Sequence, residues 1–273
     1  MPELPEVETI CRGLELHLAG RRILKVKVRE RRLRCLVDRR LAEYLEGKTI
    51  LGVERRAKYI LIPVSGDMVW MYHLGMSGKL IHVDPQTPRQ KHDHILVSLD
   101  NGRELRYHDP RRFGLSLLVA ANRLHDLPQL KRLGPDPFDA CFTGSYLHSF
   151  TKHSDRRIRD LLLDQQIVAG IGNIYANEIL SCVGIRPTTR SRRLRRSQVE
   201  EIAAMIPTVL REAIRWCGTS FSDYRDVDDK FGEFQNHLRV YDRDGEKCRF
   251  CPSPIKRVAI GNRSAFYCPT CQK

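Results

Sequence analysis

The spacing of hydrophobic residues predicts one helix and then a series of strands in the first half of the chain. Near the start, apolar side chains recur every three or four positions, which indicates an amphipathic helix over residues 3–18. Its apolar face is formed by Val7, Ile10, Cys11, Leu14 and Leu18. Alternating or β-rich runs then predict strands at 24–28, 58–64, 68–72, 95–99 and 115–119. Many short strands with turns between them, such as residues 100–103, favour an antiparallel sandwich or barrel.

The pattern becomes helical after residue 130. Glycine and proline in residues 133–137 indicate a linker. Helical spacing follows at 158–165 and 173–182, and a capping-box signature at 197–200 opens a longer helix that runs to about residue 216. Residues 217–240 are polar and poorly periodic, which predicts a loop. The predicted fold class is therefore α+β, with a first helix, an N-terminal antiparallel sandwich or barrel, and then a helical domain.

Composition gives no sign of a membrane helix and favours a polyanionic partner. Of the 273 residues 41% are hydrophobic, but no apolar run reaches the roughly 18 residues that a membrane helix needs. The acidic, proline-rich start does not look like a signal peptide, so we expect a cytoplasmic protein with no membrane partner. The formal net charge of +14 favours nucleic acid first and an anionic membrane surface second.

Arginines gather in four places along the chain, at residues 29–34, 111–112, 156–159 and 190–196. Any one such cluster is more commonly a solvated face. Four clusters together with the net surplus of positive charge favour phosphate binding as their shared role.

Four of the nine cysteines lie in the last 26 residues, as two C-x2-C pairs separated by sixteen residues. The four are Cys248, Cys251, Cys268 and Cys271. This spacing is typical of a four-thiolate zinc ribbon, and four protein ligands leave no open position, so we expect one structural Zn²⁺. Unrelated thiols and an iron–sulfur or redox site are less favoured alternatives. Residues 255–267 between the pairs read as a β-hairpin that turns at Gly261–Asn262, which places Arg263 beside a rigid tip suited to a phosphate.

The first residues can supply an unusual nucleophile. If Met1 is removed, Pro2 carries a free secondary amine with an ordinary pKa near ~7.7–8.0, so a useful fraction is neutral at physiological pH. Attack on a sugar carbon would give an iminium ion, with Glu3 as a nearby general acid or base. The alternative is a helix start, since proline favours the first turn and acidic residues complement its dipole. From these residues alone the helix start is the better interpretation.

Several other motifs are ambiguous by themselves. Gly170–Asn173 joins two helices and lacks the third glycine of a dinucleotide fingerprint, so a tight turn with phosphate-binding amides and a plain turn are equally favoured. Phe113 lies beside two arginines and Met76 between glycines, which suits wedges that unstack bases, although both could be ordinary core residues. Lys58 resembles an exposed strand end. His92 and His94 lack a third metal ligand nearby, so polar or phosphate contacts are favoured there.

Taken together, these motifs resemble the bacterial formamidopyrimidine-DNA glycosylases over the whole length of the chain. The resemblance rests on the terminal cysteines and six ordered motifs, at residues 2–9, 55–59, 73–78, 91–94, 109–114 and 170–178. It implies domains at 1–132 (β-sandwich), 151–240 (helix-two-turn-helix) and 241–273 (zinc hairpin), with a linker at 133–150. It also implies a monomeric, nucleoid-associated repair enzyme whose partner is damaged double-stranded DNA.

The resemblance implies a bifunctional enzyme. Such an enzyme excises 8-oxoguanine and formamidopyrimidines and then nicks the DNA by β,δ-elimination, and the damaged nucleotide must leave the stack first. Pro2 would attack C1′, Glu3 would handle protons at the sugar, and Lys58 and Arg263 would take the acid and phosphate roles in elimination. The void left by the base would be filled by Met76, Arg111 and Phe113, with Arg111 facing the orphaned cytosine. Phosphates would be held by His92, Arg156, Arg159 and Asn173, and residues 217–236 would cover the flipped base.

The chain departs from the family pattern at three places. Arg159 and Asp155 stand where lysine is common, and Pro252 follows Cys251 in place of the usual glycine. Two alternatives stay open at this point. One is the related endonuclease VIII group, which prefers oxidised pyrimidines, although Leu4 and the Met76, Arg111 and Phe113 set favour the purine-directed group. The other is a non-catalytic zinc-ribbon DNA-binding protein.

Overall fold

The computed structural model describes residues 1–220, 227 and 231–273, and its contacts divide the chain into two compact units. The first unit contains Met1–Lys131 and Trp216–Gln235. The second contains Arg132–Arg215 and Asn236–Lys273. Each unit has its own core and its own part of the candidate site.

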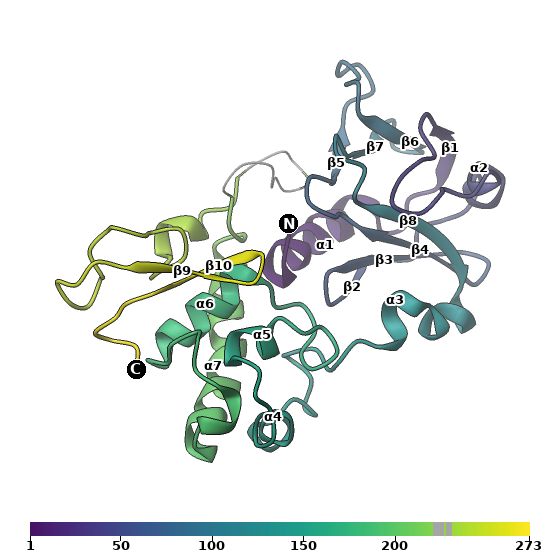
Figure 1. Cartoon of the computed structure of the whole chain (residues 1–273). Coiled ribbons are helices and arrows are strands. Elements are labelled where there is room, and N and C mark those ends of the chain that lie inside the picture. The colour runs from purple at the N-terminus through teal and green to yellow at the C-terminus, as the bar shows by residue number, and fades with distance from the viewer. Residues whose placement is uncertain (221–226, 228–230) are drawn as a thin grey trace. The chain divides into compact units, whose positions relative to one another are not determined.

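The first unit is a β-sandwich preceded by a helix (Figure 1). Helix α1 covers Leu4–Leu18 and buries the five apolar residues named from its periodicity. One antiparallel sheet has the order β1-β6-β7-β5 and the other β2-β3-β4-β8. Their strands are β1 (Ile23–Val28), β2 (Glu54–Arg56), β3 (Tyr59–Val64), β4 (Met68–His73), β5 (Lys79–Val83), β6 (Asp93–Leu99), β7 (Glu104–His108) and β8 (Leu115–Ala120). The short helices α2 (Leu41–Leu45) and α3 (Pro128–Lys131) complete the unit. The expected fold class is confirmed here.

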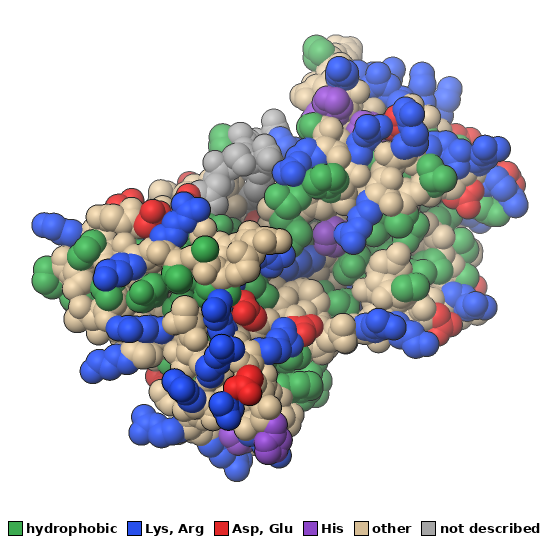
Figure 2. Space-filling model, in the orientation of Figure 1, with side chains coloured by type: hydrophobic (Ala, Val, Ile, Leu, Met, Phe, Trp, Pro, Cys, Tyr) green, Lys and Arg blue, Asp and Glu red, His purple; other side chains and the backbone are tan. Residues whose placement is uncertain are grey.

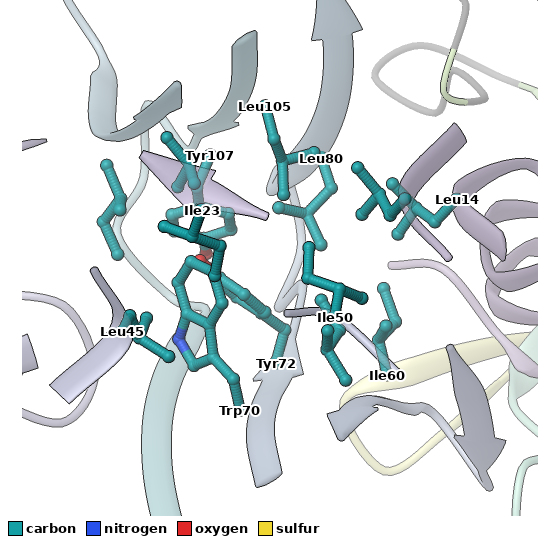
Figure 3. Packing of buried hydrophobic residues seen from close by; sticks show 14 of the residues in the cluster. Leu14, Ile23, Leu45, Ile50, Ile60, Trp70, Tyr72, Leu80, Leu105 and Tyr107 are labelled. Carbon is teal, nitrogen blue, oxygen red and sulfur yellow. The ribbon is translucent and has the colours of Figure 1, made fainter. Parts of the chain in front are cut away.

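Large aromatic side chains fill the space between the two sheets (Figure 3). Trp70 is fully buried, and its indole N–H donates to the Ser116 hydroxyl at 2.8 Å, so its only polar atom is satisfied. The rings of Tyr72, from one sheet, and Tyr107, from the other, lie 5.2 Å apart. Burying such side chains stabilises the unit by about 1.5–3 kcal/mol each.

Strands β2, β5 and β7 and helix α2 were not predicted from the sequence. β7 shows why, because it carries two buried charged residues. The fully buried Arg106 donates to the Glu104 carboxylate at 2.7 Å. A paired charge can occupy a core position that an apolar residue usually takes, and this hides the alternating pattern.

Residues 216–235 pack in the first unit although the second unit lies between them and α3 in sequence. The Thr219 backbone N–H donates to the Glu6 carboxylate at 2.8 Å. The His82 N–H of β5 donates to the Val227 carbonyl at 3.1 Å, and the Val227 side chain is part of the hydrophobic core. Thr219 therefore contacts the start of α1, and Val227 contacts β5 and the middle of α1.

The second unit combines four helices with one hairpin (Figure 1). The helices are α4 (Gly144–Thr151), α5 (Ile158–Leu162), α6 (Asn173–Cys182) and α7 (Arg196–Arg215). Strands β9 (Lys256–Ile260) and β10 (Arg263–Tyr267) form the hairpin expected from the sequence, with Arg263 opposite Ile260 across the turn. Thr143 caps α4 by accepting the Tyr146 N–H at 3.1 Å. In the described part of the chain, no helix is long and apolar enough to cross a bilayer.

Candidate active site and nucleic-acid interface

The start of α1 holds Pro2 and Glu3 in a fixed position. Glu3 is the N-cap residue, and a reciprocal capping box joins it to Glu6, whose carboxylate accepts the Glu3 N–H at 2.8 Å. Pro2 and Glu3 are buried, and Met1 is exposed. The helix-start interpretation is thus correct for the local structure. In the full-length chain the Pro2 nitrogen is an amide, so only removal of Met1 would create the amine.

Lys58 belongs to a hairpin turn next to the amino terminus. Strands β2 and β3 pair Arg56 with Tyr59, which leaves Ala57 and Lys58 as a two-residue turn. Ala57 has φ 54°, a conformation that costs a non-glycine residue free energy and is common in tight hairpins. The Lys58 side chain is only 6% exposed. The sequence favours an exposed strand end at Lys58, but the side chain is buried. A buried ammonium group is better suited to proton transfer than an exposed one.

His73 reports that these positive groups lie together. The pKa of His73 is lowered to about 4, first by burial and then by the positive charges of Lys58, Arg34 and the amino terminus. The imidazole is therefore neutral at physiological pH. Its Nδ1 accepts the Gly75 N–H at 3.0 Å, at the start of the turn that carries Met76. The first unit thus brings the amino terminus, Lys58 and the Met76 turn into one region.

Met76, Arg111 and Phe113 lie on two turns of the first unit. Met76 is 40% exposed and Phe113 is 49% exposed, which is unusual for large apolar side chains. The Arg111 guanidinium lies over the Phe113 ring, 4.7 Å from its centre. The three side chains are therefore available at the surface, as wedges must be.

His92 lies beside this region. Its ring centre is 6.0 Å from those of His94 and His108. Desolvation is the largest cause that lowers the pKa of His92, followed by the charge of His108. A neutral imidazole N–H can still donate to a phosphate oxygen.

The second unit has three phosphate-binding candidates, Arg156, Arg159 and Asn173, which differ in their burial and in their hydrogen bonds to other residues. Arg159 is fully buried and donates to the Asn173 side-chain oxygen, through Nη2 at 2.7 Å. The Asn173 Nδ2 in turn donates to the Ser264 carbonyl at 3.0 Å, next to Arg263. Arg156 is exposed and pairs with Asp164 at 2.8 Å. Arg159 and Asn173 therefore tie α5 and α6 to the hairpin that carries Arg263.

The zinc ribbon is formed by Cys248, Cys251, Cys268 and Cys271, whose sulfur atoms all lie within 4.8 Å of one another. The Cys251 sulfur is 3.4 Å from that of Cys268 and 3.6 Å from that of Cys271. A tetrahedral zinc with Zn–S bonds of about 2.3 Å needs sulfur separations of about 3.8 Å. The four thiolates fit one structural zinc ion, and among the described residues no other such cluster occurs.

Two buried residues of α6 hold the β9–β10 hairpin and the segment that leads to it, and sequence reasoning missed both. Glu178 is 2% exposed and accepts three consecutive backbone N–H groups, from Arg239, Val240 and Tyr241, at 2.7–3.0 Å. Asn177 accepts the Phe266 N–H at 2.9 Å. Both lie inside the 170–178 motif, and a polar pair on the apolar face of a predicted helix is the signal that could have identified them.

Exposed basic side chains occur on both units (Figure 2). In the first unit they include residues on and after β1, namely Lys25, Lys27, Arg29, Arg32 and Arg34. In the second unit they include Arg156, Arg192, Arg193, Arg195 and Arg196. Salt bridges such as Arg192–Asp155 at 2.6 Å neutralise only some of this charge.

The chain is similar to known proteins along its whole length. Residues 1–116 match the family described as "Formamidopyrimidine-DNA glycosylase N-terminal domain", residues 133–225 match its "H2TH domain", and residues 245–273 match "Zinc finger found in FPG and IleRS". Proteins named formamidopyrimidine-DNA glycosylase from Thioalkalivibrio sulfidiphilus and Hahella chejuensis are 47% and 44% identical, each over 100% of both chains.

Solved structures give the same picture. A Lactococcus lactis FPG mutant in complex with DNA containing Fapy-dG is 33% identical, with a TM-score of 0.93, and the match covers 100% of both chains. A second Lactococcus lactis structure, with DNA containing an abasic site, has a TM-score of 0.92 over 99% of both chains.

Proposed function

The chain belongs to the formamidopyrimidine-DNA glycosylase family, and from this we propose that it excises oxidised purines from duplex DNA and then cleaves the strand. The observation that carries the proposal is the start of α1, where the Glu3–Glu6 capping box holds a proline at position 2 in the same unit as a buried lysine. Neither the endonuclease VIII-like nor the non-catalytic alternative is favoured by the relatives.

The proposed reaction begins once Met1 has been removed. The lone pair of the Pro2 nitrogen forms a bond to C1′ while the bond from C1′ to the damaged base breaks, and the base leaves with a proton. The C1′–O4′ bond then breaks, O4′ takes up a proton, and the N,O-acetal at C1′ becomes an iminium ion. Loss of a C2′ proton then breaks the C3′–O bond and expels the 3′ phosphate, and loss of the C4′ proton breaks the C5′–O bond and expels the 5′ phosphate. Hydrolysis of the remaining iminium returns the amine.

The residues of the first unit are proposed to move the protons. Glu3 is 3% exposed, so its carboxyl would act in a site of low water content at the sugar. Lys58, held by its hairpin turn, would supply acid during elimination. Arg263, on the rigid hairpin of the second unit, would hold a phosphate with a bidentate guanidinium.

Recognition of the lesion is proposed to depend on extrusion of the nucleotide. Met76, Arg111 and Phe113 would fill the space that the base leaves, and Arg111 would face the orphaned cytosine. His92, Arg156, Arg159 and Asn173 are proposed to contact phosphates, directly or by holding groups that do. The proposed cover of the flipped base, residues 217–236, includes residues 221–226 and 228–230, which lie outside the described residues.

The zinc is proposed to act by structure alone. Four cysteine ligands leave no position for water or substrate, so the ion would hold the hairpin rigid. We also propose that the protein acts as a monomer at the nucleoid, where its substrate is found.

Borohydride trapping tests the proposal. Protein without Met1 should give a covalent, zinc-dependent adduct with an 8-oxoguanine:cytosine duplex, and both Pro2→Gly and a retained Met1 should diminish it. Mass spectrometry of the N-terminus verifies the state of each sample. Binding without an adduct would support the non-catalytic alternative, and faster cleavage of a thymine-glycol duplex would support the pyrimidine-directed one.

A further inference from the structure

Asp109 is a buried carboxylate at the junction of the two turns that carry the void-filling residues. It follows β7 directly and is 0% exposed. Its Oδ1 accepts the Ser77 hydroxyl at 2.7 Å, and its Oδ2 accepts the Gly114 N–H at 2.9 Å and the Tyr107 hydroxyl at 3.1 Å. Three donors from three separate segments therefore converge on one side chain.

Two of these donors directly follow a proposed void-filling residue in the sequence, and the third, Tyr107, lies in strand β7. Ser77 follows Met76, and Gly114 follows Phe113. The Ser77 hydroxyl also accepts the Arg111 N–H at 3.3 Å, so the same hydroxyl joins Met76, Arg111 and Asp109. The carboxylate thus connects both turns through one hydrogen bond to each.

Close backbone packing makes this connection rigid. Gly75 has φ +63°, and a Cβ atom there would lie 2.5–2.6 Å from backbone atoms of Phe113 and Gly114. A Cβ atom at Gly114 would overlap the Tyr107 hydroxyl. The two turns therefore touch through glycine backbones, and no side chain separates them.

The backbone of Asp109 is also fixed. Its N–H donates to the His92 carbonyl at 3.1 Å, and its carbonyl oxygen lies 2.8 Å from the His94 Nε2. Burial, and then the charge of Asp109, raise the pKa of Tyr107, so its hydroxyl keeps the proton that it donates. A carboxylate anchored on both sides can hold its partners in one arrangement.

We propose that Asp109 is a positioning residue that joins the Met76 turn and the Arg111–Phe113 turn into one rigid wedge. The proposal rests on the proposed function. It adds a physical reason why the protein would excise a lesion opposite cytosine faster than the same lesion opposite another base. Arg111 can test the opposite base only if its backbone is fixed relative to the two side chains that fill the void. Without Asp109 the turns would move separately, and the wedge would accept other bases opposite the lesion.

The test compares Asp109→Asn and Ser77→Ala with the control Ser116→Ala. Asparagine keeps the shape but presents an amide in place of one carboxylate oxygen, and alanine removes the hydroxyl that joins Asp109 to Arg111. Ser116 also makes buried hydrogen bonds in the first unit, with Trp70 and Tyr72, and both of these partners lie in β4, outside the two turns. Single-turnover excision is measured on 8-oxoguanine opposite cytosine and opposite adenine, together with the Tm of each variant.

Both test variants should lose at least tenfold in the ratio of the two excision rates. Ser116→Ala should keep the wild-type ratio even where its Tm falls equally. An unchanged ratio in Ser77→Ala, which is the milder variant, would overturn the proposal, as would an equal loss in Ser116→Ala. If wild-type protein forms no trapped adduct, the proposed function itself fails, which is a separate outcome.

Discussion

Glu6→Gln should destabilise the first unit and displace the proposed amine site at Pro2, because the Glu6 carboxylate accepts hydrogen bonds that hold both. One Glu6 oxygen accepts the Glu3 N–H at 2.8 Å, and the other accepts the Thr219 N–H at 2.8 Å. Glutamine has one oxygen, so its NH₂ group must face one of these two donors. The change keeps the size of the side chain and alters only its charge and its capacity to accept.

The magnitude follows from two contributions. A buried N–H left without an acceptor costs about 1–3 kcal/mol, and replacing a charged acceptor by a neutral one weakens the other bond by about 1 kcal/mol. The expected loss is about 2–4 kcal/mol. For a unit of this size it corresponds to a Tm that is lower by about 4–16 °C.

Tryptophan fluorescence can measure this loss in the first unit alone, since both tryptophans, Trp70 and Trp216, belong to it. Borohydride trapping measures the position of the amine in the same sample, and the adduct should form more slowly at a temperature where the variant is folded. The control is Glu43→Gln in α2, an exposed residue that pairs with Arg40 and should change stability by less than about 0.5 kcal/mol. A Glu6→Gln protein with the wild-type Tm and trapping rate would refute this reasoning.

Three further predictions concern the metal, the pH dependence and one glycine. Cys271→Ser should lower the zinc content, measured by metal analysis, below one ion per chain and abolish strand cleavage. Unfolding of the first unit, monitored by fluorescence, should stay unchanged. A zinc-free protein that nicks DNA normally would show that function does not need the metal. Because the pKa of His73 is lowered to about 4, the unfolded histidine near 6.5 binds its proton first on acidification. Its contribution of about 3 kcal/mol is complete above about pH 6.5 and is lost as the pH falls to 4, so urea titrations should show a steeper acid loss in wild type than in His73→Gln. Gly75→Ala should lower the free energy of unfolding by about 2–5 kcal/mol, because of the positive φ and the contact with Phe113. Gly102 also has a positive φ but open space around it, so Gly102→Ala should lower it by only about 1–2 kcal/mol. Equal midpoints of unfolding in urea would contradict this.

The features that the sequence predicts well are those whose signals are local. Helix α1 and the β9–β10 hairpin follow from periodicity and turn residues within a few positions of each other. The four zinc ligands follow from their spacing. The Glu3–Glu6 capping box is also local, but glutamate at the N-cap is outside the usual Ser/Thr pattern, so the start of the chain suggested a helix without suggesting its anchor.

The contacts that hold the site are distant in sequence, and no pattern encodes them. Glu6 and Thr219 are 213 residues apart, and Glu178 accepts backbone groups 61–63 residues further on. Asp109 is recognisable as part of a motif, but its three donors come from one strand and two turns, and only the fold brings these together. Sequence motifs can therefore name Pro2, Met76 and Arg111 as candidates, whereas the residues that position them require the structure.

The non-contiguous first unit has a consequence for synthesis on the ribosome. Residues 1–131 are made first, yet Val227 is part of their core and the Thr219 N–H satisfies Glu6. At about 5–20 residues per second, the remaining 104 residues up to Gln235 take about 5–20 s to add. During that interval the nascent sandwich lacks the contacts made by Thr219 and Val227, so the proposed amine site next to Glu6 should be completed only after the second unit's helices have been synthesised.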